Sequence, residues 1–420
     1  MPDTAPSRVR PAFALLLLLA MAMPMLVLYA LGVLAPHMLA GHGWNRQQYG
    51  WLGAGSFALA ALLSPFAGAL VQSLGAARLL GWLFALVALG FALLASTAGG
   101  LALACALACC GMAQALCNPV TNQLIAAHAA PSQRAALIGF KQSGVQLAAL
   151  LAGLLLWPLA QHIGWQAVFG WLLPPLALLW LASLRLQRHL PASPTPAPAR
   201  QPALQAPTVA LRWLMLAQLC NGIALAVFVA FMPLQMAQLL PGAAAAQAMA
   251  AFGAAGLLAR WALPRLAQDA QQTRRTLLWL VGPTIAALLL LAQLDSASTS
   301  ARPALLLLAA LTLGGSAVAS NALAMSLLLQ SRACGSPASS AGWLSCGFFS
   351  GFAFGPPLAG LLLQHGLHFS TLWQGLAVLA LPLWLALWRL GAHLRPAVAA
   401  PVAASNTVFS SLSPSQQDHA

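Results

Sequence analysis

Long apolar runs alternate along this chain with short polar segments that contain Gly, Pro, Gln and Arg. A helix needs about 20 mainly apolar residues to cross the hydrocarbon core of a bilayer. The runs have this length, so the pattern predicts an all-α, polytopic membrane protein with twelve transmembrane helices. The predicted ranges are 11–35, 49–72, 78–97, 99–124, 136–160, 165–185, 211–236, 245–266, 276–294, 302–328, 338–363 and 369–390.

The first apolar run follows two arginines, Arg8 and Arg10, and in this respect it resembles a secretory signal peptide. It continues without interruption to about residue 35, which is longer than the apolar core of a signal peptide. We therefore interpret this run as the first transmembrane helix.

A polar segment rich in Pro and Ala separates the sixth predicted helix from the seventh, and this composition is typical of a linker. The C-terminal residues have no helical or strand periodicity, which is typical of disorder. The predicted organisation is an N-terminal cytoplasmic segment at 1–10, a six-helix bundle at 11–185, a cytoplasmic linker at 186–210, a second six-helix bundle at 211–392 and a disordered tail at 393–420.

The two predicted bundles share landmarks at a constant offset of 203 residues. These matches are informative because an Ala- and Leu-rich chain produces few chance identities at Asn, Gln, His and Gly. We interpret them as the duplication of a six-helix unit in parallel orientation, which predicts two pseudo-symmetric bundles. The matched residues are Asn118 and Asn321, Leu124 and Leu327, Gly139 and Gly342, Gly144 and Gly347, and Gln161-His162 and Gln364-His365.

The composition excludes several classes of protein. Hydrophobic residues make up 61% of the chain and charged residues only 5%, whereas soluble globular proteins contain about 25% charged residues. The net charge is +14, but the basic residues stand singly or in pairs and form no stripe with aromatic residues, so we expect no nucleic-acid partner. The seven cysteines have no accompanying His or acid, so we expect no metal or cofactor.

The basic residues predict the orientation of the helices. Fourteen arginines fall in the terminal segments, in loops or at span ends on one side of the predicted spans, and only Arg46 and Arg302 fall on the other. Because cytoplasmic loops carry the excess of Arg and Lys, both chain ends are predicted to be cytoplasmic. Two further basic residues, Lys141 and Arg260, lie farther inside predicted helices.

Twelve predicted helices in two related halves, joined by a cytoplasmic linker, resemble the major facilitator superfamily over about residues 10–392. In that family the loop between the second and third helices reads roughly Gly-x-x-x-Asp-Arg-x-Gly-Arg-Arg. The corresponding GALVQSLGAAR keeps Gly68, Gly75 and Arg78, which the resemblance implies are gating residues. Gln72 replaces the acid of the motif, so most of the usual charged contact between helices is missing.

The segment that contains Lys-Gln-Ser-Gly at the start of the fifth helix is also similar to bacterial members of the superfamily, including cyanate-transporter-like carriers of small anions. The resemblance implies a secondary carrier that works by alternating access, with two halves rocking about a central cavity. It also implies a bacterial-type inner membrane, a small-molecule substrate and a surrounding lipid bilayer. We expect the carrier to be monomeric.

Lys141 is the one lysine of the chain and stands in a predicted helix. A charged side chain at mid-bilayer costs roughly 2.5–3.5 kcal/mol on insertion scales, so it usually faces a cavity or a partner. One interpretation is that Lys141 attracts an anionic substrate in the central cavity. The alternative is that its flexible side chain reaches the cytoplasmic headgroups. The repeat places Leu344 at the equivalent position, so the charge breaks the pseudo-symmetry.

Arg260, in the eighth predicted helix, has two possible roles. Its guanidinium could hold a carboxylate of the substrate with two hydrogen bonds. Alternatively, Arg260 and Asp269 could form a cytoplasmic gate, and we count both among the candidate gating residues.

Several uncharged polar residues lie inside the predicted helices and are candidates for substrate contact. Asn118 and Asn122 are four residues apart and therefore share a helix face. In the major facilitator superfamily the first, fourth, seventh and tenth helices line the cavity, which the resemblance extends to this chain. The candidate substrate-binding residues, together with Lys141, are Asn118, Asn122, Asn321, Gln142, Tyr29, Gln218 and Asn221.

The four acids of the chain, Asp3, Asp269, Asp295 and Asp418, all fall in predicted loops or termini. Proton relays in carriers usually need a buried carboxylate or His, so coupling through a carboxylate is disfavoured. The predicted function is facilitated transport or exchange of a small organic or inorganic anion, or symport in which the substrate itself carries the proton. The alternative is efflux of amphiphilic, drug-like compounds. We find no catalytic constellation and expect no enzyme activity.

Overall fold

The computed structural model describes residues 11–42, 44–96, 99–189, 206–240, 242–267, 269–335 and 337–394. Within these ranges the regular secondary structure is entirely helical, so the predicted all-α class is confirmed. The predictions for the N-terminal segment, for most of the linker and for the C-terminal tail fall outside the described residues.

The helices form two sets. The first comprises α1 (Pro11–His42), α2 (Arg46–Leu74), α3 (Ala76–Ala95), α4 (Gly100–His128), α5 (Pro131–Gln142), α6 (Gly144–Leu151), a π-helical turn η1 (Ala152–Leu156), α7 (Trp157–Ile163), α8 (Trp165–Trp171) and α9 (Leu173–His189). The second comprises α10 (Val209–Leu239), α11 (Ala244–Leu266), α12 (Ala270–Ala292), α13 (Arg302–Leu313), a π-helical turn η2 (Gly314–Val318), α14 (Ala319–Gln330), a short 3₁₀ helix η3 (Arg332–Cys334), α15 (Pro337–Gln364) and α16 (Phe369–His393).

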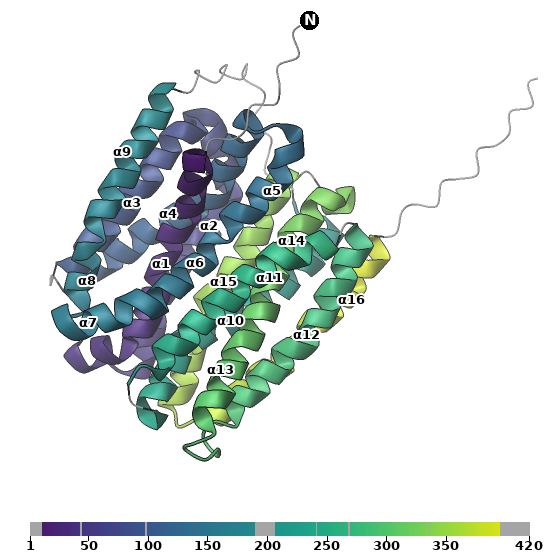
Figure 1. Cartoon of the computed structure of the whole chain (residues 1–420). Helices are drawn as coiled ribbons and strands as arrows, with labels where there is room; N and C mark the ends of the chain where they lie inside the picture. The colour runs from purple at the N-terminus through teal and green to yellow at the C-terminus, as the bar shows by residue number, and fades with distance from the viewer. Residues whose placement is uncertain are drawn as a thin grey trace, which may run out of the picture.

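The two sets pack side by side as two halves, with the purple-to-teal helices next to the green-to-yellow helices (Figure 1). The most extensive contacts between the halves are those of α2 with α15, α6 with α11, and α1 with α10. The halves therefore enclose the centre of the molecule, where α1 and α10 are mostly buried.

Eleven stretches of the described chain are long and apolar enough to cross a membrane. The remaining predicted span, 245–266, is also helical as α11. This helix is rich in Ala and carries Arg260 and Arg265, so it is less apolar than the other spans. One side of α11 packs against α6, η1 and α13, while Leu258, Trp261 and Leu266 are exposed on its other side.

The structure differs from the predicted spans in continuity and length. The fifth predicted span is broken at Ser143 between α5 and α6, and the sixth is broken at Leu172. Helix α9 continues to His189, inside the segment predicted as linker, and α10 already begins at Val209. Hydrophobicity alone misses such polar end turns, since a helix can extend beyond the apolar core of the bilayer.

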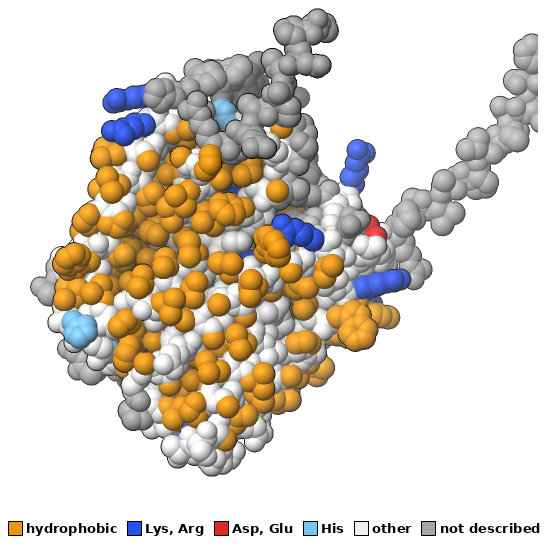
Figure 2. Space-filling model, viewed as in Figure 1, with side chains coloured by type: hydrophobic (Ala, Val, Ile, Leu, Met, Phe, Trp, Pro, Cys, Tyr) orange, Lys and Arg blue, Asp and Glu red, His pale blue; other side chains and the backbone are white. Residues whose placement is uncertain are grey.

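The outer surface is apolar, as expected for a multi-pass membrane protein. Figure 2 shows hydrophobic side chains spread over most of the face in view, with Lys and Arg mainly toward its upper part. Large side chains such as Trp82 and Trp279 are 59% and 81% exposed. A soluble protein rarely leaves so much contiguous apolar surface in water, so this surface fits contact with lipid acyl chains.

At the end of the molecule predicted to face away from the cytoplasm, α2 and α15 pack closely. A Cβ atom added at Gly50 would lie 2.5 Å from the carbonyl oxygen of Pro356. The hydroxyl of Tyr49 donates a hydrogen bond of 3.1 Å to the carbonyl of Leu31 on α1. Farther from this end, the ring centroids of Phe57 on α2 and Phe352 on α15 are 4.7 Å apart. These contacts close this end of the space between the halves.

Gly144 begins α6 at a point where that helix touches α1. A Cβ atom at this position would collide with the carbonyl oxygen of Leu18 and lie 3.1 Å from Cβ of Met21. Overpacking of this kind costs about 1–3 kcal/mol. We therefore expect Gly144→Ala to lower the melting temperature of the purified protein by about 3 °C or more, measured by thermal unfolding in detergent.

The matched control is Gly139→Ala on α5, because no atom lies within 4 Å of the added Cβ there. Its melting temperature should stay at or above that of the wild type, since Ala favours helix more than Gly does. Equal melting temperatures for the two variants would contradict the close packing of α1 and α6.

Candidate functional site

A cavity of about 300 Å³ lies between the two halves, near the end formed by the α2–α3, α4–α5 and η3–α15 turns. This is the end predicted to be cytoplasmic. The side chains of Gln72 and Gln123 at the cavity are exposed, whereas that of Gln142 is buried. The cavity therefore runs from an accessible rim to a buried floor. Its lining residues are Ser64, Pro65, Gly68, Val71, Gln72, Ala115, Asn118, Pro119, Asn122, Gln123, Ala126, Ile138, Gln142, Met325, Leu328, Ala341, Gly342 and Ser345.

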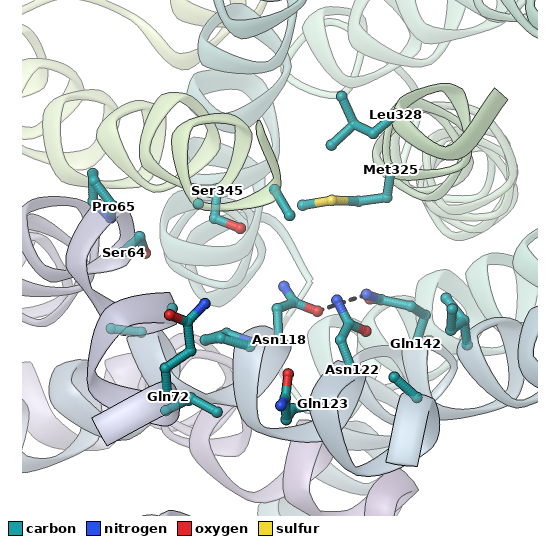
Figure 3. A pocket seen from close by; sticks show the side chains of 18 residues that line it. Ser64, Pro65, Gln72, Asn118, Asn122, Gln123, Gln142, Met325, Leu328 and Ser345 are labelled. Carbon is teal, nitrogen blue, oxygen red and sulfur yellow. Dashed lines mark hydrogen bonds between the residues drawn. The ribbon is translucent and has the colours of Figure 1, made fainter. Parts of the chain in front are cut away.

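The two walls of the cavity differ chemically. Figure 3 shows the amides of Asn118, Asn122 and Gln142 on one side, with Met325 and Leu328 of α14 facing them. The amide wall belongs to the first half and offers several hydrogen-bond donors and acceptors. The facing wall belongs to the second half and is mostly apolar, apart from Ser345. No charged side chain is among those that line this cavity.

A smaller inner pocket of about 30 Å³ lies one turn deeper and shares Asn118, Gln142, Met325 and Ser345 with the cavity. Arg260 lines this pocket, so a cation is present at its inner end. Its other lining residues are Met21, Met25, Gln114, Cys117, Val145, Asn321, Phe348 and Phe349.

The residues around this space follow the 203-residue repeat. Each of the following pairs lines the cavity or the inner pocket with both of its members: Asn118 and Asn321, Asn122 and Met325, Ile138 and Ala341, Gln142 and Ser345, and Val145 and Phe348. The space between the halves therefore lies on the pseudo-symmetry axis. The second half offers smaller or less polar side chains at most of these positions, which explains the chemical difference between the walls.

Lys141 is completely buried, and its side chain does not reach the headgroups in this structure. Its Nζ donates hydrogen bonds to Oγ1 of Thr121 at 2.7 Å and to Oδ1 of Asn118 at 3.1 Å, and it lies 4.0 Å from Sδ of Met21. The ammonium therefore stands behind the amide wall, among α1, α4 and α5. Its repeat partner Leu344 is also fully buried, so both residues occupy core positions.

Asn118 connects this buried cation to the cavity. Its Oδ1 accepts hydrogen bonds from Lys141 and, at 2.8 Å, from Nε2 of Gln142. Asn118 lines both the cavity and the inner pocket. A ligand that hydrogen-bonds Asn118 would thus be one side chain away from the Lys141 ammonium.

The break between α5 and α6 frees a backbone carbonyl for Arg260. In a continuous helix the amide of Gln146 would bond the carbonyl of Gln142. Here that amide bonds the carbonyl of Ser143 at 3.0 Å instead. The carbonyl of Gln142 accepts a hydrogen bond from Nη1 of Arg260, which belongs to the other half. This bond crosses between the halves and orients the guanidinium toward the inner pocket.

The surroundings of Arg260 leave hydrogen-bonding capacity unused. The side chain is only 4% exposed, and its Nε has no hydrogen-bond partner. Oε1 of Gln146 also has no partner, while its Nε2 lies 3.4 Å from the hydroxyl of Tyr29. On the amide wall, Oδ1 of Asn122 is likewise buried without a partner. Unsatisfied buried groups are uncommon in folded proteins, and a ligand or water can complete them.

The two described carboxylates are both engaged elsewhere. Asp269 caps α12 by accepting bonds of 2.8 Å from the backbone amides of Gln271 and Gln272. Asp295 accepts bonds from Nε2 of Gln235 and from the backbone of Ser370. Within the described part of the chain, no carboxylate faces Lys141 or Arg260. Arg260 and Asp269, which the sequence suggested as a gate, have different partners in this conformation.

The other predicted binding residues are distributed unevenly. Asn321 lines the inner pocket and donates to Oε1 of Gln218 at 3.3 Å. Gln218 is fully buried, and its Nε2 has no partner. Asn221 donates to the carbonyl of Ala317 and lines a minute space inside the second half. Tyr29 is buried beside Gln146. The structure thus brings Asn118, Asn122, Gln142 and Asn321 to the cavity system, and Asn221 packs elsewhere.

Of the predicted gating residues, Gly68 lines the cavity and Arg78 is exposed at the start of α3. Gly75 joins α2 to α3 with φ of 85°, a conformation that favours glycine. Gln72, which replaces the acid of the family motif, lines the cavity instead of forming an ion pair.

Four important residues were not among the predicted sites. Thr121 provides the shortest contact to Lys141, and its position three residues after Asn118 placed it on the same helix face. Ser345 is the repeat partner of Gln142, so the offset alone could have identified it. Phe348 lines the inner pocket together with Phe349, but an aromatic residue in an apolar helix gives no signal that separates cavity from core.

No group of three or more His, Cys, Asp or Glu residues that could hold a metal ion occurs in the described chain. The free cysteines are scattered over several helices.

Comparison with solved structures finds the same architecture in other proteins. One is a bacterial homologue of the human lysosomal transporter Spinster, in an inward-facing and occupied conformation. It shares 17% sequence identity with this chain, the TM-score is 0.59, and the alignment covers 91% of this chain and 95% of that one. At this identity the likeness concerns the fold. Comparison with curated proteins finds no match.

The sequence pattern of the family described as Major Facilitator Superfamily matches residues 17–336, which is most of the chain. This match agrees with the helical fold, the two halves and the central cavity. The family consists of membrane transporters, so the protein is a transporter and not an enzyme. The chain belongs to the major facilitator superfamily.

Proposed function

We propose that this transporter moves a small organic or inorganic anion across the membrane, with the anion bound in the inner pocket and the adjoining cavity. The observation that carries the proposal is the presence of two buried basic side chains, Lys141 and Arg260. Among the described residues no carboxylate faces them, because both described carboxylates bind other groups. The two cations are linked through Asn118 and Gln142 by hydrogen bonds.

Each buried charge is costly by itself. Removing an ammonium or a guanidinium from water costs several kcal/mol unless an opposite charge or strong hydrogen bonds compensate it. Lys141 has only neutral acceptors, and the guanidinium of Arg260 bonds a backbone carbonyl. An anion that enters the inner pocket would supply the missing negative charge. Its binding would therefore be favoured over that of a neutral molecule or a cation of similar size.

The proposed roles follow from the positions of the side chains. Arg260 lines the inner pocket and carries an unpaired Nε, so it is the residue that we propose touches the anion. Asn118 and Gln142 would orient the ligand from the amide wall, and Asn321 from the opposite side. Lys141 lies behind Asn118, one side chain farther from the anion, and would add positive electrostatic potential in the inner pocket. Tyr29 and Gln218 support the neighbouring amides, and Asn122 lines the wider cavity.

Alternating access requires that the contacts between the halves open and close. The close packing of α2 and α15 at the outer end fits a state that is accessible from the cytoplasmic end. We propose that Arg260, whose hydrogen bond crosses between the halves, takes part in this movement. Gly68, Gly75 and Arg78, together with Asp269 at the start of α12, remain the proposed gating residues near the cytoplasmic end.

A second candidate function is efflux of amphiphilic, drug-like compounds. The observation in its favour is the apolar wall formed by Met325 and Leu328, with Phe348 and Phe349 in the inner pocket. An amphiphile could place its apolar part against these side chains. The buried cations favour the anion proposal, because an apolar compound would leave them uncompensated.

The anion proposal is tested by thermal unfolding of the purified transporter with a panel of ligands. The panel contains benzoate, benzenesulfonate, thiocyanate and nitrate as anions, and choline and an uncharged aromatic amide as controls. A ligand at 100 times its dissociation constant stabilises the native state by about 2.7 kcal/mol. We expect at least one anion to raise the melting temperature while choline does not. Stabilisation by amphiphilic cations, with no response to any anion, would favour the efflux function instead.

We further propose that the protein lies in a bacterial-type inner membrane as a monomer, with both chain ends in the cytoplasm. The arginine distribution supports this orientation. A green fluorescent protein fused after residue 420 should fluoresce when the fusion is expressed in bacteria, because this reporter folds in the cytoplasm and fails after export in unfolded form. A dark fusion that is nevertheless full-length in the membrane would place the C-terminus outside.

A further inference from the structure

The hydrogen-bond partners of Lys141 match a neutral amine better than an ammonium. Two full-strength acceptors, Oγ1 of Thr121 and Oδ1 of Asn118, lie at hydrogen-bond distance from Nζ. The third neighbour is the thioether of Met21 at 4.0 Å, which is a weak acceptor. A neutral amine can donate its two N–H groups to the two oxygens. An ammonium has a third proton, for which the described residues provide no strong acceptor.

Among the described residues, no charged group close to Lys141 compensates an ammonium. From α4 the titratable neighbour is the thiol of Cys117, which donates to backbone carbonyls of Ala20 and Ala113. From α1 the neighbour is Met21, which does not titrate. From α11 the nearest charge is Arg260, which is positive and reaches the backbone of the adjacent residue, Gln142. The charge on Lys141 is therefore sensitive to whatever occupies the inner pocket.

We infer that Lys141 couples anion transport to proton transport: its amine takes up a proton when an anion binds in the inner pocket and loses it when the anion leaves. This inference rests on the proposed anion transport and adds a second transported ion, the proton. It differs from symport in which the substrate carries the proton, because the proton here resides on the protein.

The coupling follows from linked equilibria. A bound anion stabilises the ammonium, and the ammonium in turn strengthens anion binding by the same factor. On binding, the lone pair of the Lys141 amine forms an N–H bond with a proton from hydronium in the cavity, which leaves a water molecule. On release, that N–H bond breaks and the proton returns to water. Asn118 separates Nζ from the cavity, so its side chain must move for the proton to pass.

The charges of the transport cycle then balance for a monovalent anion. The loaded carrier moves one negative charge on the anion and one positive charge on Lys141, whereas the empty carrier returns with a neutral amine. Neither step moves net charge through the membrane. An inward proton gradient would therefore drive net uptake of the anion without a carboxylate in the spans.

The direct test is the number of protons taken up when an anion binds. The purified wild-type transporter is placed in weakly buffered detergent with a pH indicator and titrated with benzenesulfonate, thiocyanate and benzoate. Benzenesulfonate and thiocyanate are anions of strong acids and cannot carry the proton themselves. We expect uptake of about one proton per bound anion at pH values where the amine is neutral in the empty carrier and charged in the loaded one, about half a proton at the midpoint of the titration of the empty carrier, and less well below it.

Two substitutions separate this role from a purely structural one. Arginine cannot be deprotonated in proteins, so Lys141→Arg keeps the charge but removes the proton exchange. Lys141→Met removes the charge. We expect both variants to take up no protons on binding. In proteoliposomes, uptake of labelled benzenesulfonate driven by a pH gradient, expressed relative to each variant's own exchange rate, should fall by about tenfold or more in Lys141→Arg.

Arg265→Gln is the matched control, because Arg265 contacts Trp261 on its own helix and does not line the inner pocket. It should behave like the wild type in both assays. Anion binding without proton uptake in the wild type would overturn the inference and leave the proposed function intact. Unchanged proton-driven uptake in Lys141→Arg would also overturn it. Binding of none of the three anions would instead overturn the proposed function, and the inference with it.

Discussion

Replacement of Arg260 by Gln is expected to weaken anion binding by roughly 30-fold or more. Truncating one partner of a buried, hydrogen-bonded charge pair costs about 2 kcal/mol at least, and every 1.4 kcal/mol is a factor of ten in affinity. Arg260 is buried, lines the inner pocket and has an unpaired Nε. Binding of the anion that most stabilises the wild type, measured by isothermal titration calorimetry, gives the change directly.

Two further variants serve as comparisons for Arg260→Gln. Arg260→Lys keeps a positive charge but loses the planar fork, so its affinity should fall between those of the wild type and Arg260→Gln. Arg265→Gln removes a positive charge outside the pocket and should leave the affinity within about twofold. If Arg260→Gln and Arg265→Gln bind the anion equally well, Arg260 does not contact it.

Asn118→Asp is expected to have the second large effect, because it supplies a counter-ion to Lys141 without a change in shape. The new carboxylate would accept the hydrogen bonds from Lys141 and Gln142 that Oδ1 of Asn118 accepts now. It would also place a negative charge on the wall of the cavity and the inner pocket. We expect anion affinity to fall by roughly tenfold or more, while the melting temperature stays equal or rises.

The test is specific because Asn118→Asp should lower the anion affinity without lowering the melting temperature. A substitution that merely disturbs packing would lower both the melting temperature and the affinity. Asn122→Asp is the matched control, since Asn122 also lines the cavity but makes no hydrogen bond to Lys141. Asn122→Asp should lower the anion affinity by less than Asn118→Asp does. Undiminished anion affinity in Asn118→Asp would contradict the proposal that an uncompensated Lys141 helps to bind the anion.

The sequence predicted the architecture well because its main signal, the apolar run, is set by the thickness of the bilayer. The repeat offset of 203 residues also carried spatial information. It related Asn118 to Asn321, and both line the inner pocket. The offset pairs Gln142 with Ser345 as well, and these two residues face each other across the cavity system.

The sequence did not predict the direction in which the Lys141 side chain points. Consecutive helical residues point about 100° apart, so Lys141 and Gln142 cannot face the same space. The structure directs Gln142 into the cavity and Lys141 behind its wall. Deciding between these two orientations requires the rotation of α5 against α1 and α4. Periodicity alone leaves this rotation open in a helix that is apolar on most sides.

The break after Gln142 could not be predicted for a related reason. Helix propensity does not predict that the amide of Gln146 bonds the carbonyl of Ser143 and not that of Gln142. The change is compensated by a tertiary contact, which local sequence does not indicate. The freed carbonyl of Gln142 bonds Arg260, which lies far away in the sequence. The sequence likewise left open whether Arg260 faces a substrate or Asp269, and in this conformation Arg260 lines the inner pocket.

Locating a bound anion would show whether the inner pocket binds it beside Arg260, on which the proposed transport depends. A crystal structure with 4-bromobenzenesulfonate would locate the bromine by its anomalous signal and the sulfonate in the electron density. We expect the sulfonate in the inner pocket, within hydrogen-bond distance of Arg260 and near Asn118. A sulfonate bound elsewhere, with Arg260 still bonded only to the carbonyl of Gln142, would contradict the proposal.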